Sequence, residues 1–245
     1  MFECARTAIR LMAAFPGTWA LTTVIFLVAV ETTVVVPYLG ILVKLYLGAL
    51  LSVQTLVMFI DAERGKKPSV RSLLGAFTRP FDTQLVIVLA GLVPFSCGVA
   101  YLACVGGAPA ACFFLDRLHA TQRPPEELLV QAKYIMYLAS LPFTFVGTAI
   151  VFEQRRGVQA LRRGLSLARE QPSALVVMFV ISCGFEWAVP HIIRAVAYPA
   201  LRVAFALVVA AAFVAWSFAF IAAVALHLYR DQAHGARSES FHGAS

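Results

Sequence analysis

Residues 41–60 read ILVKLYLGALLSVQTLVMFI, a stretch in which Lys44 is the only charged residue. A helix of about 20 apolar residues is long enough to cross the hydrocarbon core of a bilayer. Similar stretches recur along the chain, and we expect a transmembrane helix at each of six places: 19–36, 41–60, 85–102, 131–152, 174–193 and 203–229. The sequence therefore predicts an all-α, polytopic membrane protein in which residues 1–245 form a single integral membrane domain.

The composition is typical of this class. Hydrophobic residues make up 60% of the chain and charged residues 13%, about half the charged fraction of soluble domains. The net charge of +7 is typical of a membrane protein whose loops face the anionic cytoplasmic leaflet, so we expect no nucleic-acid binding. The five cysteines form no C-x-x-C pair, which argues against a zinc ribbon or a thioredoxin-type site.

Most of the basic residues fall in four short segments: before the first predicted span, after the second, after the fourth and after the sixth. An even number of spans between them places all four segments on one side of the membrane. Short cytoplasmic loops carry an excess of Lys and Arg, so this side is predicted to be cytoplasmic. We therefore expect a multi-pass protein of the bacterial inner membrane with both termini in the cytoplasm, including a tail at residues 230–245.

The spans group into three pairs, each preceded by a short basic segment and a proline, at Pro16, Pro80 or Pro172. Apolar residues in these segments recur at helical spacing, which predicts short amphipathic helices. These residues are Ala5, Ala8, Ile9 and Met12 in the first segment, Val70, Leu73, Leu74 and Phe77 in the second, and Val158, Leu161 and Leu165 in the third. The pattern indicates a three-fold repeat of an interfacial helix followed by a transmembrane hairpin.

Each pair of spans also ends in the same short pattern: an acid, two residues, a base and a glycine. The pattern begins at Asp61, Glu153 and Asp231. Glycine suits the position just after a helix, and a cation suits the C-terminal end of the helix dipole. We interpret the pattern as helix termination.

Basic amphipathic helices beside a span lie naturally among lipid head groups, with their apolar side chains in the bilayer and their cations on phosphates. We therefore expect the bilayer and its anionic phospholipids to be the main partner. The basic residues expected to make these contacts are Lys66, Lys67, Arg71, Arg155, Arg156, Arg162 and Arg163. Docking of a cytoplasmic or membrane protein on the same helices is the alternative.

Charges inside the predicted spans are the candidates for a functional site, because an ionisable group in hydrocarbon is costly. Glu31 and Glu186 lie at nearly the same depth on the first and fifth spans, and Lys44 and Lys133 lie near that depth on the second and fourth. One interpretation is structural, with Glu31 paired to Lys44 across the first hairpin. The other is a polar pocket that opens outward and accepts an anionic head group or a coupling proton.

Cys104 and Cys112 flank the sequence Gly-Gly-Ala-Pro at 106–109 on the predicted outer side. They form a disulfide there or pack as small apolar residues. No nucleophile elbow, zinc-protease motif, P-loop or dinucleotide fingerprint is found. We therefore expect no enzymatic activity, no metal site and no cofactor.

Four places give the chain a resemblance to a known family. They are Pro37-Tyr38-Leu39-Gly40, the stretch 65–77, the stretch 152–166 with Ala160-Leu161 before Ser166, and Tyr229-Arg230-Asp231. In these the chain resembles uncharacterised bacterial multi-pass inner-membrane proteins, distantly related to the membrane domain of glycerophosphodiester phosphodiesterases. The resemblance implies six helices and cytoplasmic termini, and it implies no reaction and no site residues.

These observations lead to two functional hypotheses. The first is a non-enzymatic inner-membrane protein that supports envelope or lipid-linked processes or acts as a membrane scaffold. The alternative is a small transporter whose outward-facing polar pocket lies at the depth of Glu31 and Glu186. A transporter requires a cavity that both acids face, whereas a scaffold requires a closed bundle in which the acids are paired.

Overall fold

The computed structural model describes residues 2–35, 39–116, 122–195, 208–209, 213 and 216–229, and every regular element in this part of the chain is a helix. The elements are α1 (Phe2–Ala14), α2 (Pro16–Glu31), η1 (Thr32–Val35), α3 (Leu39–Glu63), η2 (Val70–Ala76), α4 (Phe81–Leu115), α5 (Glu126–Ser140), η3 (Leu141–Phe143), α6 (Val146–Phe152), α7 (Gly157–Glu170) and α8 (Pro172–Ala195). A further stretch, Trp216–Tyr229, is called the C-terminal helix. The all-α prediction is confirmed.

Three continuous stretches are long and apolar enough to cross a membrane: α3, α4, and the run from Glu126 to Phe152. Up to five spans result if each of two bent helix pairs counts as one. These lengths and compositions suggest a membrane protein. Of the predicted span 203–229, the structure describes the helix Trp216–Tyr229 and little else, and the predicted tail 230–245 lies outside the described residues.

Two sharp bends separate a short helix from the apolar helix that follows it. The helices α1 and α2 meet at 93°, and α7 and α8 meet at 88°. Pro16 and Pro172 are the first residues of α2 and α8. Proline suits this position because its missing N–H has no helical acceptor there. At both places the order of a short helix, a proline and an apolar helix agrees with the prediction, whereas the segment before Pro80 is the 3₁₀ helix η2 and not the predicted amphipathic α-helix.

The short helices turn mainly small side chains toward the rest of the protein. In α1, Cys4, Ala8 and Leu11 are buried while Ile9 is exposed, and in α7 the residues Ala160 and Gly164 are buried while Val158 is exposed. Leu73 is the only large side chain of η2 that is buried, and Leu74 and Phe77 are exposed. Each predicted apolar face is therefore divided, with Ala8 and Leu73 packed in the protein and Ile9, Leu74 and Val158 exposed. Small residues allow helices to approach closely, and large apolar residues suit a lipid environment.

The helix-termination pattern holds at one of its two described copies. Gly65 follows α3 with φ of 74°, and its N–H donates to the carbonyl of Ala62. At the second copy the prediction is wrong, because Gly157 is the first residue of α7 and the left-handed position after α6 belongs to Gln154, with φ of 52°. The third copy lies outside the described residues.

The helix α4 reverses direction near its C-terminal end. Gly107 has φ of 76° and ψ of 179°, a conformation that is open essentially to glycine alone. Phe95 and Phe114 stack with ring centroids 5.6 Å apart, although a straight helix would separate residues 19 positions apart by about 28 Å. The segment 108–115 therefore folds back along the preceding part of α4, where the sequence predicted an irregular loop.

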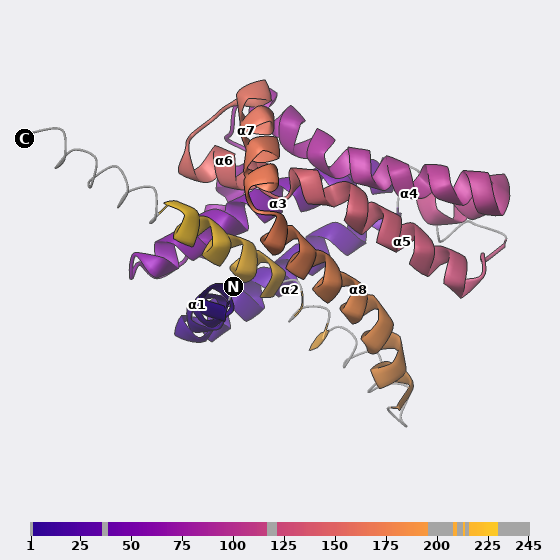
Figure 1. Ribbon diagram of the computed structural model, residues 1–245, viewed down its shortest axis with the longest axis horizontal. Coiled ribbons are helices and arrows are strands. Elements are labelled where there is room, and N and C mark those ends of the chain that lie inside the picture. Colours follow the sequence, from indigo (N-terminus) through magenta and orange to yellow (C-terminus); the bar gives the residue numbers. More distant parts are fainter. Residues whose placement is uncertain are drawn as a thin grey trace, which may run out of the picture.

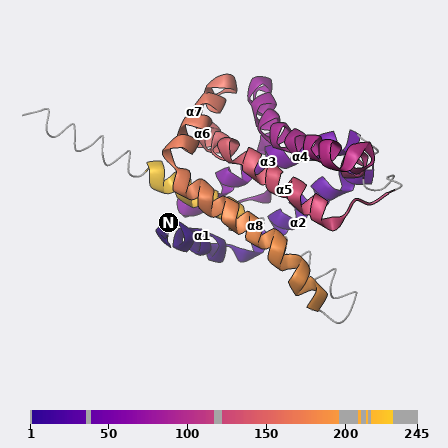
Figure 2. The ribbon, with the colours of Figure 1, turned by 45° about the vertical axis from the view of Figure 1, so that its right-hand side comes forward.

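The end of α3, the connection from α6 to α7 and the end of the C-terminal helix lie at one end of the molecule. We call this the basic end, after its exposed cations Lys66, Lys67, Arg71, Arg155, Arg156 and Arg162. There Arg10 donates to Glu63 at 2.7 Å, and the Tyr229 hydroxyl donates to Glu153 at 2.7 Å. Figure 1 shows α4 and α5 lying side by side and running away from α7, and the Tyr101 hydroxyl joins the two by donating to Gln131 at 2.6 Å. Figure 2 shows α8 diverging from this pair in a second view.

Candidate functional site

A cavity of about 350 Å³ lies between α3, α4, α5 and α8, and we call it the polar pocket. Three of the four predicted intramembrane charges line it: Lys44, Lys133 and Glu186. The fourth, Glu31, has a side chain outside the described part of the structure, so its predicted pairing with Lys44 stays a prediction. The pocket therefore brings together charges from three helices that are far apart in the sequence.

Glu186 is held by two groups from α5. Lys133 Nζ donates to Glu186 Oε2 at 2.6 Å, and the Tyr137 hydroxyl donates to Oε1 at 2.7 Å. The two donors share one face of α5 because they are four residues apart. Burying a carboxylate is costly unless both of its oxygens find partners, and the Glu186 side chain is only 15% exposed. This pairing fixes α8 to α5.

Two further charged residues line the mouth of the polar pocket, Arg123 and Glu126. They lie at the start of α5, and both are exposed. Arg123 forms no hydrogen bond or ion pair with the described part of the chain, which leaves its guanidinium available to a ligand. With Lys44 and Lys133, the pocket holds three cations against two carboxylates, and one of these carboxylates is already bound by Lys133.

The polar pocket also has an apolar lining. It includes Phe95 from α4, Phe113 and Phe114 from the segment that folds back at Gly107, and Leu129 from α5. Phe95 and Phe114 reach the same pocket only because α4 reverses direction. The lining is therefore amphipathic, with both cations and aromatic rings.

Sequence reasoning missed several residues of this pocket. Tyr137 had a detectable signal, since it lies one helical turn after Lys133. Arg123 and Glu126 were assigned to a loop, and Phe113 and Phe114 lie beyond the end of the predicted span. No pattern in the sequence indicates that α4 folds back far enough to bring those rings to Phe95.

A second polar network lies at the basic end. Glu153 accepts hydrogen bonds from Arg163 Nε and from the Tyr229 hydroxyl, each at 2.7 Å, and Arg155 lies at 3.4 Å. Phe152 and Tyr229 stack with centroids 4.8 Å apart. Burial alone would raise the pKa of the Glu153 carboxyl, but the hydrogen bonds from Arg163 and Tyr229 outweigh burial and hold that pKa below its ordinary value. The network joins α6, α7 and the C-terminal helix.

The predicted lipid-contacting cations divide into two groups. Six of them are exposed at the basic end: Lys66, Lys67, Arg71, Arg155, Arg156 and Arg162. Arg163 is only 26% exposed and binds Glu153 and Glu170. Its guanidinium is therefore engaged within the protein, and no spacing rule in the sequence separates it from the neighbouring Arg162.

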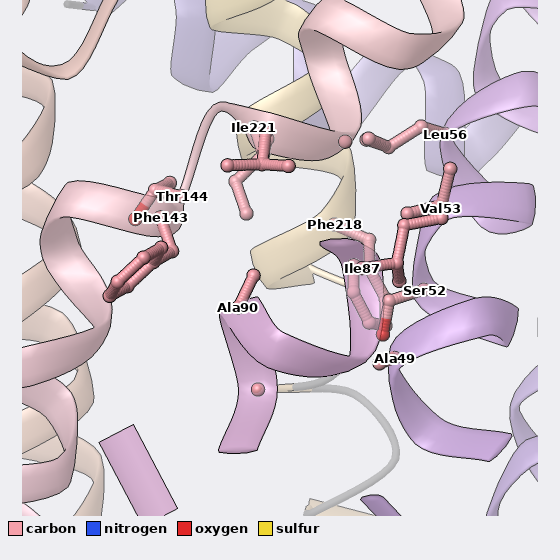
Figure 3. Close-up of a pocket in the computed structure, with 13 residues that line it drawn as sticks. Ala49, Ser52, Val53, Leu56, Ile87, Ala90, Phe143, Thr144, Phe218 and Ile221 are labelled. Carbon is pink, nitrogen blue, oxygen red and sulfur yellow. The ribbon is translucent and has the colours of Figure 1, made fainter. Parts of the chain in front are cut away.

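A smaller cavity of about 180 Å³ lies between α3, α4, α6 and the C-terminal helix (Figure 3). Small or apolar side chains line it, among them Ala49, Ala90, Leu56 and Ile221. Its lining includes no charged residue, and the Ser52 hydroxyl donates to the carbonyl of Gly48. This cavity offers a ligand no polar anchor comparable to those of the polar pocket.

All five cysteines are free, including Cys104 and Cys112. Among the residues that the structure describes, no group of three or more His, Cys, Asp or Glu is placed to hold a metal ion. Comparison of the chain with protein-family models, with curated proteins and with solved structures finds no match.

Proposed function

We propose that this protein is a non-enzymatic, multi-pass membrane protein that binds an anionic amphiphile in the polar pocket. The ligand class is a molecule with a phosphate or carboxylate head group and an apolar tail. Such a protein would support envelope or lipid-linked processes. The observation that carries the proposal is the amphipathic lining of the pocket, which contains Lys44 and Arg123 together with the rings of Phe95 and Phe114.

The chemistry of the pocket lining favours this ligand class. Ligand sites combine an apolar lining with a few polar groups that fix orientation. Hydrogen bonds between a cation and an oxyanion are roughly twice as strong as neutral ones. Arg123 is unpaired within the described residues, so it offers these bonds without first breaking an internal ion pair.

The membrane arrangement is part of the proposal. It comprises six spans in three hairpin repeats, the inner membrane of a bacterium, and both termini in the cytoplasm. Two bends of nearly 90° at Pro16 and Pro172 support the repeat, because both separate a short helix from an apolar one. The concentration of exposed cations at the basic end supports the orientation, with anionic phospholipids as partner. The resemblance to bacterial inner-membrane proteins points the same way.

The transporter hypothesis is the alternative for the same pocket. It is favoured by Glu186, which lines the cavity and lies on the apolar helix α8. Its carboxylate is paired with Lys133, as expected of a scaffold, and it also faces a cavity, as expected of a transporter. For a transporter, we expect a proton gradient to drive the uptake of dodecyl phosphate into proteoliposomes. Glu186→Gln would remove the dependence of this uptake on the gradient. Binding without such uptake favours the first hypothesis.

Thermal denaturation of the full chain in dodecyl maltoside tests the binding proposal. We expect dodecyl phosphate to raise the melting temperature in a saturable way. Inorganic phosphate, which has the head group without the tail, should have little effect. Arg123→Gln should weaken the apparent affinity for dodecyl phosphate by about fivefold, the loss of about 1 kcal/mol of charge-assisted hydrogen bonding at a half-open site.

Lys67→Gln is the matched control, because it also removes one exposed positive charge but lies at the basic end. It should bind dodecyl phosphate as the wild type does. Arg123→Gln is preferred to a Lys133 variant, since loss of Lys133 leaves the Glu186 carboxylate without its cation. An unchanged affinity in Arg123→Gln, or no saturable response in the wild type, would refute the proposal.

A further inference from the structure

A second hollow lies at the basic end, between the first turns of α4 and the connection from α6 to α7. Its volume is about 750 Å³, and we call it the interfacial groove. Residues 153–157 form its polar side. Leu85 and Leu89, one helical turn apart on α4, form its apolar side together with Val158 of α7. These three apolar side chains are 47%, 39% and 60% exposed, respectively.

The two acids of the interfacial groove are already occupied. Glu153 accepts from Arg163 and Tyr229, as described above. Asp82 accepts from the N–H of Thr83 at 2.8 Å, and its Oδ2 lies against Gly157, the first residue of α7. A carboxylate in that position is favoured by the positive end of the helix dipole. Glu153 is therefore neutralised by Arg163, whereas Asp82 is exposed and held by the Thr83 N–H beside the start of α7.

The two arginines of the groove are, by contrast, weakly engaged. Within the described residues the Arg155 side chain has a single ion pair, with Glu153 at 3.4 Å, and it is 53% exposed. The Arg156 side chain is exposed and forms no hydrogen bond or ion pair with the described residues. Two guanidinium groups that line one groove offer donors that match the oxygens of a phosphate.

We propose that the interfacial groove binds one anionic phospholipid, whose head-group phosphate contacts Arg155 and Arg156 and whose acyl chain lies along Leu85 and Leu89. The occupant is a lipid and not a free phosphate, because the apolar wall continues along α4, which is long and apolar enough to span a membrane. This inference rests on the proposed membrane location of α4 but not on the ligand of the polar pocket. Of the exposed cations at the basic end, the inference assigns Arg155 and Arg156 to one binding site.

Native mass spectrometry and thermal denaturation of the full chain in neutral detergent test this site. The probe is dioleoyl phosphatidylglycerol, with dioleoyl phosphatidylcholine and glycerol phosphate as comparisons. We expect the wild type to retain phosphatidylglycerol, to retain phosphatidylcholine less, and to ignore glycerol phosphate, which has no acyl chain. The double variant Arg155→Gln/Arg156→Gln should retain phosphatidylglycerol about tenfold less. Arg156→Gln alone, which removes no side-chain contact with the described residues, should reduce the retention of phosphatidylglycerol by less than the double variant does.

The matched control is Arg64→Gln/Arg169→Gln, which removes two exposed charges that do not line the groove and are not among the predicted lipid-contacting cations. It should retain phosphatidylglycerol as the wild type does. Equal retention in the Arg155/Arg156 variant, equal loss in the control, or binding of glycerol phosphate would overturn the inference. The response to dodecyl phosphate that depends on Arg123 is measured on the same variants. If that response persists while the groove variants behave like the wild type, the groove inference fails and the proposed function stands.

Discussion

Glu186 and Glu153 each join helices that are distant in the sequence, and their surroundings differ. Glu186 bridges α8 to α5 through Lys133 and Tyr137 beside the polar pocket. Glu153 lies at the basic end, outside the stretch Glu126–Phe152 that is apolar enough to span a membrane. Protonation of Glu153 is therefore open to test with bulk pH.

We expect Glu153→Gln to lower the free energy of unfolding by about 2 kcal/mol, because it removes the charge from two hydrogen bonds at a largely buried site. Glu170→Gln is the control, since Glu170 also accepts from Arg163 but its side chain is 46% exposed. It should cost less than about 0.5 kcal/mol. Thermal denaturation in detergent at neutral pH measures both, and equal effects of the two substitutions would argue against the role of Glu153.

Comparison of the wild type with Glu153→Gln also predicts how the stability contributed by Glu153 depends on pH. The folded state holds the pKa of Glu153 below the ordinary value of 4.5, so the carboxylate stabilises the fold fully above that pH. The stabilisation is lost as pH falls from the ordinary pKa toward the folded-state pKa. The difference in melting temperature between the wild type and Glu153→Gln should therefore stay constant from pH 7 down to the ordinary pKa and shrink as the pH falls below it.

At the level of elements, the reversal of α4 at Gly107 positions one wall of the polar pocket. Without it, Phe113 and Phe114 would lie at the far end of a straight α4 instead of beside Phe95. The prolines play a comparable part at the other end, where Pro16 and Pro172 begin the helices that leave α1 and α7 at nearly right angles.

Gly107→Ala should destabilise the protein by about 1–3 kcal/mol, because alanine has a Cβ and does not adopt φ of 76° with ψ of 179° without strain. It should also weaken the response to dodecyl phosphate, since the aromatic wall would shift. Gly184→Ala is the control, because it lies within α8 and its new Cβ meets no neighbour within 4 Å. A melting temperature for Gly107→Ala equal to that of Gly184→Ala would contradict the importance of the reversal.

At the level of the whole molecule, the two ends differ in chemistry. The basic end gathers exposed cations and the Glu153 network, whereas the polar pocket lies toward the start of α3 and α5. If the basic end faces the cytoplasm, a membrane-impermeant thiol reagent added to intact cells should label a single cysteine at position 108 in an otherwise cysteine-free variant. It should not label a cysteine at position 69 or 238. Labelling at 238 from outside would reverse the proposed orientation.

The sequence alone determined the helical class, the apolar stretches and the short helices that end before Pro16 and Pro172. These are local properties, set by runs of apolar residues and by the missing N–H of proline. It also selected Lys44, Lys133 and Glu186 as a group, because a charge in an apolar run is conspicuous wherever it occurs.

The tertiary structure decided which of these charges pair and what encloses them. Glu186 is bound by Lys133 and Tyr137 because α5 and α8 pack together. The apolar faces predicted for the short helices are partly buried in the protein, as at Ala8 and Leu73, and partly exposed, as at Ile9 and Leu74, since helical spacing defines a face but not the surface it meets. The wall formed by Phe113 and Phe114 depends on the reversal at Gly107, a backbone choice that Gly-Gly-Ala-Pro permits and that only packing against Phe95 selects.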